Sequence, residues 1–239
     1  MNMTSPRIAL ISGASTGLGK ELVPLISGLG FQIIKLGFKS AGIVDYRVDL
    51  TDPVLTQELV NRIIDEHGPI SLVIANAGGG KKPAHELSFE ELNAYFMDRN
   101  FSTAMNLITA SMNSLLRTKG SVIAISSIVA IKEIENAPAG YTQSKKALNA
   151  YIREVASEQG KYGVRANLIS PGNVYFPGSR WDELKTLNPE LVSETLSKGV
   201  PLGNFIAPSE IAAAIKYLTS EGACNITGTN IVIDGGQSL

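Results

Sequence analysis

The alternation of short apolar runs with longer amphipathic segments is the feature that most constrains how this chain can fold. Runs of the first kind, such as residues 7–12 and 70–75, are largely apolar rather than apolar at every second position. Strands of this kind are typical of a parallel sheet covered by helices on both faces. The sequence therefore predicts an α/β fold in which residues 1–239 form a single domain, a doubly wound parallel sheet with helices on both faces.

The predicted elements follow from hydrophobic periodicity and from helix and turn signals. Pro53 suits the first turn of a helix in which Leu55, Leu59 and Ile63 recur at helical spacing. Pro24 falls inside the first helix, where it should bend that helix. We expect strands at 7–12, 32–37, 46–49, 70–75, 121–126, 165–170 and 229–233, an irregular loop at 38–45, and helices ending near 29 and spanning 53–67, 89–117 with a break near Asn100, 141–162 and 209–220.

Composition and charge narrow the classes of partner. The chain of 239 residues is 44% hydrophobic, which is enough to bury a sizeable core, and its formal net charge is −1. A near-neutral chain without an obvious basic patch argues against nucleic acid and against an anionic membrane as partners. The apolar run at 8–11 is too short for a signal sequence or a membrane span. We therefore expect a soluble, cytoplasmic protein.

The cysteine and the two histidines indicate no special chemistry. Cys224 has no second cysteine to pair with, which excludes an intramolecular disulfide and suits a reducing compartment. It precedes a strand-like run, where we interpret it as a small packing residue. His67 and His85 are isolated from each other and from any cluster of cysteine or histidine. The sequence therefore predicts no metal site built by the protein.

A glycine-rich turn follows the first predicted strand and opens the first helix. It reads Ser12-Gly13-Ala14-Ser15-Thr16-Gly17-Leu18-Gly19. Glycines in this context let the backbone turn sharply and approach a diphosphate, whose charge is stabilised at a helix N-terminus. The spacing differs from the common G-x-G-x-x-G pattern, so the turn alone is also compatible with a plain strand-to-helix connection.

Tyr141 and Lys145 lie four residues apart at the start of an amphipathic segment. Four residues are about one helical turn, so both side chains fall on the same face of a helix. A lysine held there can lower the pKa of the phenol and stabilise the phenolate, which makes Tyr141 a usable general acid or base. The same spacing occurs by chance in helices, so its meaning depends on the motifs around it.

In order and spacing, these motifs together resemble the short-chain dehydrogenase/reductase family, in particular its branch similar to 3-oxoacyl-(acyl-carrier-protein) reductase. The resemblance covers nearly the whole chain. Besides the glycine turn and the pair Tyr141 and Lys145, the matching motifs are Asn76-Ala77-Gly78, Ser126-Ser127, Pro171-Gly172, Ile226-Thr227-Gly228 and Asp234-Gly235-Gly236. The resemblance implies a Rossmann-like fold and an oxidoreductase that transfers a hydride between a nicotinamide cofactor and a ketone or secondary alcohol. We expect it to run as a carbonyl reductase on a small-molecule substrate.

The resemblance also implies a catalytic tetrad of Asn100, Ser127, Tyr141 and Lys145. Tyr141 would protonate the carbonyl oxygen, and Lys145 would hold the nicotinamide ribose and lower the pKa of the tyrosine. Ser127 would donate a hydrogen bond to the substrate oxygen, and Asn100, at a helix irregularity, would anchor a water molecule in the proton relay. The loop between Ser127 and Tyr141 is one residue longer than the family pattern. We prefer Ser127 to Ser126 because Ser126 should still belong to the strand.

For the cofactor, the resemblance implies contacts from several turns that follow strands. The expected cofactor-binding residues are Gly13, Ser15, Thr16, Gly17, Leu18, Gly19, Lys39, Asp49, Leu50, Asn76, Ala77, Gly78, Tyr141, Lys145, Pro171, Gly172 and Val174.

The choice between NADP(H) and NAD(H) depends on the end of the second predicted strand. A carboxylate there would bind the ribose 2′-hydroxyl and repel a 2′-phosphate. Gly37 occupies this position and Lys39 follows it, so we favour NADP(H) over NAD(H). Two features keep NAD(H) open: Thr16 stands where NADP-preferring relatives often have a basic residue, and Asp45 could reach the ribose.

The resemblance leaves the substrate undefined but implies a lid and an assembly. Residues 173–204 would fold over the substrate, and the chain would form a homotetramer or dimer through residues 100–117, residues 141–162 and the C-terminal strand. Two alternatives stay open at this point: a non-catalytic regulator that binds a nicotinamide dinucleotide, and an alcohol dehydrogenase that prefers NAD.

Overall fold

A seven-stranded sheet forms the centre of the molecule in the computed structural model, which describes residues 7–38, 42–83, 85–135 and 137–239. All neighbouring strands are parallel and run in the order β3-β2-β1-β4-β5-β6-β7. The strands are β1 (Arg7–Ile11), β2 (Phe31–Gly37), β3 (Tyr46–Arg47), β4 (Ile70–Ala75), β5 (Ser121–Ile125), β6 (Arg165–Pro171) and β7 (Asn230–Ile233).

The strand order reverses direction between β1 and β4. The chain first builds outward from β1 to β2 and β3, and then returns to pair β4 with the other side of β1. This is the doubly wound arrangement that the sequence predicts, and the single-domain α/β fold is confirmed. In sheets of this kind the crevice at the carboxyl ends of the strands, at the point of reversal, is where ligands bind.

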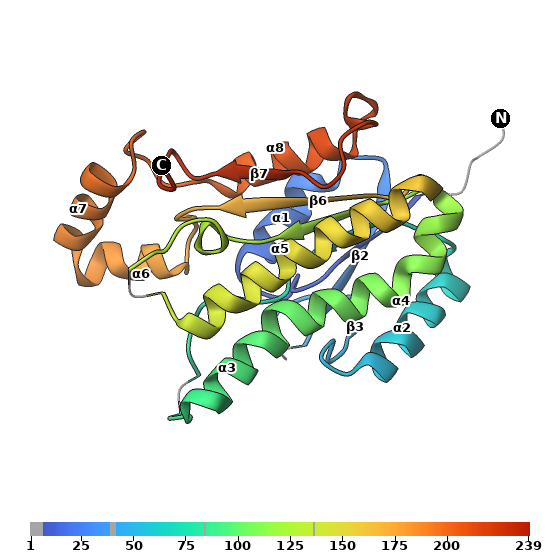
Figure 1. Ribbon diagram of the computed structural model, residues 1–239, viewed down its shortest axis with the longest axis horizontal. Helices are drawn as coiled ribbons and strands as arrows, with labels where there is room; N and C mark the ends of the chain where they lie inside the picture. The colour runs from blue at the N-terminus through green and yellow to red at the C-terminus, as the bar shows by residue number, and fades with distance from the viewer. Residues whose placement is uncertain (1–6, 39–41, 84, 136) are drawn as a thin grey trace.

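Helices cover both faces of the sheet (Figure 1). On one face, α1 packs beside α8; on the other, α2, α4 and α5 lie side by side, with α3 against α5. The helices are α1 (Gly17–Ile26), α2 (Pro53–His67), α3 (Phe89–Met97), α4 (Thr103–Thr118), α5 (Ala139–Gln159), α6 (Arg180–Leu187), α7 (Pro189–Gly199) and α8 (Pro208–Thr219), with short turns η1 (Asp98–Ser102), η2 (Ile128–Ala130), η3 (Gly160–Tyr162) and η4 (Glu221–Ala223).

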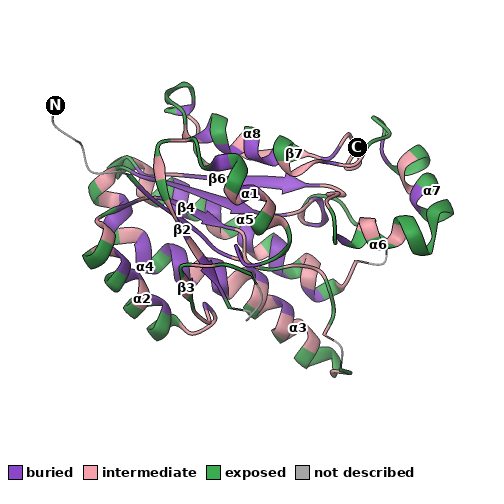
Figure 2. Ribbon diagram, turned by 180° about the vertical axis from the view of Figure 1, so that it is seen from behind, coloured by how far each residue is buried: buried purple, intermediate pink, exposed green. Residues whose placement is uncertain are grey.

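Alternate residues of β1 show how the two cores form. Ile8 and Leu10 point into the core beneath α4 and α5, whereas Ala9 and Ile11 point into the core beneath α1 and α8, and all four are buried. Figure 2 shows the helices buried on their inner sides, and the central strands β1, β4, β5 and β6 are buried along most of their length. Burying a side chain the size of isoleucine contributes roughly 1.5–3 kcal/mol. These two cores hold the carboxyl ends of the strands in place.

The segment expected to break near Asn100 does so. α3 and α4 are joined by η1, a five-residue π-helical turn that contains Asn100. Such turns insert an extra residue into a helix and are frequent at functional sites. The described part of the loop at 38–45 contains no helix, and Pro24 lies inside α1, both as predicted.

Three details differ from the sequence-based predictions. Cys224 is exposed, so its interpretation as a packing residue is wrong; the buried residue at this turn is its neighbour Ala223. The third strand ends at Arg47 rather than Asp49, which leaves Asp49 in the loop that follows. The segment after β6 contains a second helix, α7, because Asn188 caps it and Pro189 fits its first turn.

Candidate active site

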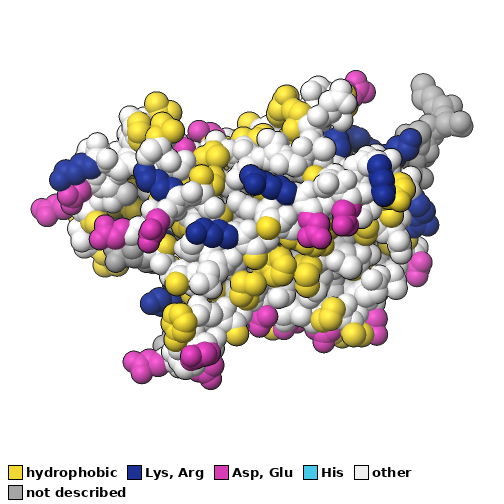
Figure 3. All heavy atoms as spheres, viewed as in Figure 1, with side chains coloured by type: hydrophobic (Ala, Val, Ile, Leu, Met, Phe, Trp, Pro, Cys, Tyr) yellow, Lys and Arg dark blue, Asp and Glu magenta, His cyan; other side chains and the backbone are white. Residues whose placement is uncertain are grey.

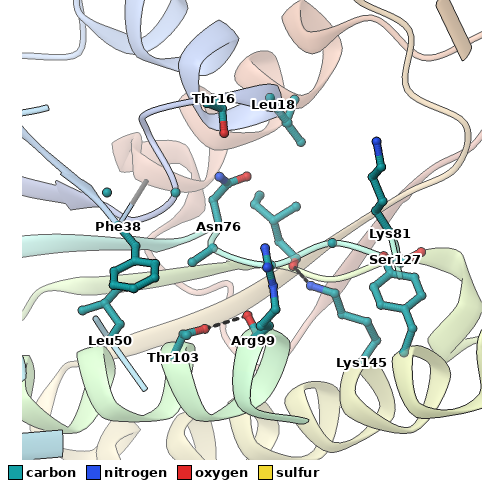
Figure 4. Close-up of a pocket in the computed structure, with 18 of the residues that line it drawn as sticks. Thr16, Leu18, Phe38, Leu50, Asn76, Lys81, Arg99, Thr103, Ser127 and Lys145 are labelled. Atoms are coloured by element: carbon teal, nitrogen blue, oxygen red, sulfur yellow. Dashed lines mark hydrogen bonds between the residues drawn. The ribbon is translucent and has the colours of Figure 1, made fainter. Parts of the chain in front are cut away.

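A cavity of about 660 Å³ opens at the carboxyl ends of β1, β4 and β5 (Figure 4). This volume lies in the range of ligand-binding clefts. The predicted site residues that line it are Gly13, Ser15, Thr16, Gly17, Leu18, Asp49, Leu50, Asn76, Ala77, Gly78, Ser127, Tyr141, Lys145, Pro171, Gly172 and Val174. The structure therefore brings most of the predicted cofactor-binding residues and three of the predicted tetrad residues together around one space.

The glycine turn forms one wall of the cavity. Gly13 has φ +67°, and a Cβ atom there would lie 2.9 Å from Cα of Ala77, so a side chain would not fit. The Ser12 hydroxyl accepts hydrogen bonds from the backbone N–H groups of Asn76 and Ala77, both at 3.0 Å, which ties the turn to the end of β4. Thr16 caps α1 without a side-chain hydrogen bond, so the cap leaves the first N–H groups of α1 available, and Thr16, Gly17 and Leu18 line the cavity. This cradle fits a diphosphate.

Lys145 lies at the inner end of the cavity. Its side chain is 4% exposed, and Nζ donates a hydrogen bond to the backbone oxygen of Ile125 at 2.8 Å. Burial lowers the pKa of Lys145 to about 8, because the charged ammonium loses its hydration. The lysine thus reaches from α5 to the end of β5, and its ammonium can lose and regain a proton near neutral pH.

Tyr141 is held between α5 and α3. Gly140 packs so closely on α3 that a Cβ atom would lie 2.6 Å from Oδ1 of Asn93, and the Tyr141 ring lies 6.0 Å from the Phe96 ring. Burial raises the pKa of the Tyr141 phenol, and a hydrogen bond with the Ser127 hydroxyl partly offsets this effect. The phenol is therefore protonated at neutral pH.

The expectation that Lys145 lowers the pKa of the tyrosine stays a prediction. The Lys145 ammonium lies 6.0 Å from the centre of the Tyr141 ring. Burial and the hydrogen bond with Ser127 are the effects that shift the pKa of the phenol here. The structure presents a phenol that can donate a proton.

The two adjacent serines after β5 point to different partners. Ser127 forms the hydrogen bond with Tyr141, whereas the hydroxyl of Ser126 donates to Oδ1 of Asn149 on α5 at 2.5 Å. β5 ends at Ile125, and the N–H of Ser126 still bonds to β6. The geometry thus sets Ser127, the residue preferred from the sequence, beside the phenol.

Asn100 is fully buried beneath the cavity rather than in it. Its Oδ1 accepts a hydrogen bond from the N–H of Gly79 at 2.7 Å, and its Nδ2 donates to the backbone oxygen of Phe96 at 3.0 Å. The side chain therefore fixes the loop after β4 to η1. A role in anchoring water stays a prediction for Asn100, and its amide is engaged by the protein backbone.

Two residues considered for the cofactor, Gly19 and Asp45, lie elsewhere. Gly19 sits beneath the turn, where a Cβ atom would be 2.3 Å from the oxygen of Gly13. Asp45, the acid that could have reached the ribose, accepts from the N–H of Lys35 at 2.7 Å and pairs with its Nζ at 3.3 Å. Lys39 lies outside the described residues.

The structure also brings residues to the cavity that the sequence reasoning missed. Among them are Tyr95, Asp98, Arg99 and Thr103. Arg99 could have been identified from the sequence, because it directly precedes Asn100 in the predicted helix break. A charged residue at a helix irregularity beside a glycine-rich loop is well placed to enter a cleft.

Two aromatic side chains stack at the base of the segment after β6. The rings of Tyr175 and Phe205 are stacked with centroids 5.6 Å apart, and Trp181 lies 5.2 Å from Phe205. Lys185 places its ammonium 4.0 Å from the Tyr175 ring centroid. These contacts hold α6 against the segment that leads into α8.

Within the described ranges, no three His, Cys, Asp or Glu side chains gather in a way that could hold a metal ion. Of the helices that the structure describes, none combines the length and the apolar character needed to cross a membrane.

Fold and site define a Rossmann-like protein with a dinucleotide-sized cleft. A family model described as enoyl-(acyl carrier protein) reductase matches residues 32–238. L-fucose dehydrogenase of Bos taurus is 30% identical over 98% of this chain and 90% of its own. 3-Oxoacyl-(acyl-carrier-protein) reductase FabG of Vibrio cholerae is 29% identical over 98% of both chains. The crystal structure of an oxidoreductase of the short-chain dehydrogenase/reductase family from Burkholderia thailandensis has a TM-score of 0.84 at 27% identity, covering 98% of this chain and 93% of that chain.

The chain belongs to the short-chain dehydrogenase/reductase family. It is an NAD(P)-dependent oxidoreductase that acts on substrates of the alcohol or ketone type.

Proposed function

We propose that the protein is an NADPH-dependent carbonyl reductase with Tyr141 as its proton donor. The observation that carries this proposal is the placement of the Tyr141 phenol beside Ser127, in the same cavity as Lys145 and the glycine turn. A phenol whose pKa is raised by burial is in the right form to give a proton to a carbonyl oxygen. Reduction of a ketone requires that proton.

The roles of the three side chains follow from their contacts. When bound, the nicotinamide group supplies the hydride. Ser127 donates a hydrogen bond to the substrate oxygen, and Tyr141 donates the proton to it as negative charge develops there. Lys145, whose ammonium is buried and exchangeable, binds the ribose hydroxyls and stabilises the tyrosinate that remains. The buried Asn100 keeps the loop after β4 in place beneath the substrate.

Preference for NADP(H) is supported by the end of β2. Gly37 and Phe38 line the cavity there, and neither carries a negative charge. Asp45, the nearby acid, is occupied by Lys35 through its backbone and its ammonium. A 2′-phosphate would therefore meet no carboxylate from the described residues at the end of β2, whereas the 2′-hydroxyl of NAD(H) would lack its usual acidic partner there. Asp49, which lines the cavity after β3, accepts from the N–H and the hydroxyl of Thr51.

A substrate screen with both cofactors tests the function and the preference together. The panel consists of acyl thioesters, keto-sugars and small alicyclic ketones, each assayed with NADPH and with NADH at saturating and limiting concentrations. We expect kcat/KM to be at least about tenfold higher with NADPH, because the acidic contact worth about 1.4 kcal/mol or more is missing for NADH. Equal efficiency, or better efficiency with NADH, would overturn the preference.

Ser127 and Ser126 offer a matched pair of variants. Ser127→Ala should lower kcat by about 10²-fold, because it removes a donor aimed at the developing oxyanion. Ser126→Ala removes the hydrogen bond to Asn149 and should cost about 1 kcal/mol of stability with turnover retained. Steady-state kinetics and chemical denaturation of both variants check this. If Ser126→Ala is the inactive variant, the assignment is reversed.

We also propose a lid and an oligomer. Residues 173–204 carry α6 and α7 and would cover the substrate end of the cavity, with Val174 at the base paired to Ile206. The support for a homotetramer or dimer is the face formed by α4 and α5, over which Figure 3 shows hydrophobic side chains gathered. Cytoplasmic location stays a prediction.

A further inference from the structure

Arg99 brings a positive charge into the cavity from the wall opposite the glycine turn. It belongs to η1, and its half-buried side chain lines the cavity. Figure 4 shows the side chain rising from the helical floor toward the middle of the cavity, between Leu50 at one end and Lys145 at the other. The proton-transfer chemistry described above gives this arginine no role.

The guanidinium is held by an aromatic neighbour rather than by an acid. Its Nη1 donates to the hydroxyl of Tyr95 at 2.9 Å, and its carbon lies 5.1 Å from the centre of the Tyr95 ring. Its neighbour Asp98 accepts from Ser102 at 3.4 Å, and none of the ion pairs among the described residues involves Arg99. A guanidinium has five N–H donors in a fork that suits phosphate oxygens. Most of this fork is available to a ligand.

The glycine turn and the backbone of Arg99 lie close to each other across the floor of the cavity. A Cβ atom at Gly13 would lie 2.9 Å from Cα of Ala77, and a Cβ atom at Gly78 would lie 3.2 Å from the backbone oxygen of Arg99. Ala77 and Gly78 are consecutive, so their Cα atoms are about 3.8 Å apart. The glycine turn and the backbone of Arg99 therefore flank a single dipeptide, a gap that an arginine side chain can span.

We propose that Arg99 binds the diphosphate of the nicotinamide cofactor opposite the N-terminus of α1. This inference rests on the proposed function and adds to it one further residue that binds the cofactor. A diphosphate in the cradle of Gly13 and Thr16 would have free helical N–H groups on one side and the Arg99 fork on the other. Opposed donors of this kind neutralise its charge without closing the adenine end near Phe38 or the hydride-transfer end near Tyr141.

The dissociation constants of NADPH and NADH, measured by titration without substrate, test whether Arg99 binds the diphosphate. Arg99→Met should weaken both by about 10- to 100-fold, the loss of charge-assisted hydrogen bonds to a phosphate. The affinity of Arg99→Lys for both cofactors should lie between those of Arg99→Met and the wild type, because lysine keeps the positive charge but lacks the fork of N–H donors. Arg117→Met, which changes an exposed arginine of α4, should bind both cofactors like the wild type. Melting temperatures compare the folding of all four proteins.

Three results would overturn the inference. Unchanged affinity in Arg99→Met removes the contact altogether. A loss confined to NADPH places the arginine at the 2′-phosphate instead. A raised KM for the carbonyl substrate with unchanged cofactor affinity assigns Arg99 to an anionic group of the substrate. If the wild type itself binds neither dinucleotide, the proposed function is wrong, a result distinct from the other three.

Discussion

Tyr141→Phe should lose turnover by about 10³-fold while binding NADPH nearly as well as the wild type. The substitution removes the hydroxyl that would donate the proton and leaves the ring packed beside Phe96. It also frees the Ser127 hydroxyl, which is hydrogen-bonded to the phenol. In our proposal cofactor binding depends mainly on the glycine turn, Lys145 and Arg99, so the loss should appear in kcat. Single-turnover kinetics with saturating NADPH measure it directly.

Tyr151→Phe is the matched control for this experiment. Tyr151 lies on the same helix, α5, and its hydroxyl contacts the Thr109 hydroxyl at 3.1 Å, away from the cavity. It should keep full turnover. If Tyr141→Phe retains a tenth or more of the wild-type rate, a different group supplies the proton, and the proposed mechanism is wrong.

Lys145→Met should weaken cofactor binding and lower turnover, and it should also change how stability depends on pH. Burial lowers the pKa of Lys145 from 10.5 to about 8 in the folded state. Between these two values the unfolded chain holds a proton that the folded protein lacks, so this group makes stability rise with pH in that window and has no slope below it. The rise is on the order of 3 kcal/mol, and Lys145→Met should lack it.

Denaturant unfolding at pH 7.5 and at pH 10 measures this difference. The raised pKa of Tyr141 acts in the opposite direction above pH 10, but both proteins contain the tyrosine, so its effect cancels in the comparison. Lys146→Met changes the exposed neighbouring lysine and should leave turnover and cofactor affinity unchanged. An identical pH profile in wild type and Lys145→Met would show that the buried lysine keeps an ordinary pKa.

The local motifs were predictable because each depends on a short stretch of chain. The glycine turn needs a strand before it and a helix after it, and Tyr141 and Lys145 need one turn of helix between them. Both requirements are met by β1, α1 and α5. The break at Asn100 was predictable for the same reason, although its π-helical form was not.

Properties that depend on the packed state were not predictable in this way. The pKa of Tyr141 is raised because the phenol is buried, and the hydrogen bond with Ser127 only partly offsets this effect, which no spacing reveals. Asp45 accepts a hydrogen bond from the N–H of Lys35 because β2 and the start of β3 lie side by side. Cys224 is exposed because a short turn, η4, precedes β7 and buries Ala223 instead. In each case the outcome depends on burial or on a contact that exists only in the folded protein.

The most direct test of the central claim is a single-turnover reaction with NADPH deuterated at the transferred position of C4. Mass spectrometry of the products from the ketone panel locates the label. The account predicts one deuterium on the carbinol carbon of at least one product with the wild-type protein, and about 10³-fold slower transfer with Tyr141→Phe. Tight binding of NADPH by the wild type with no deuterium transferred to any carbonyl would contradict it and indicate a non-catalytic binding protein.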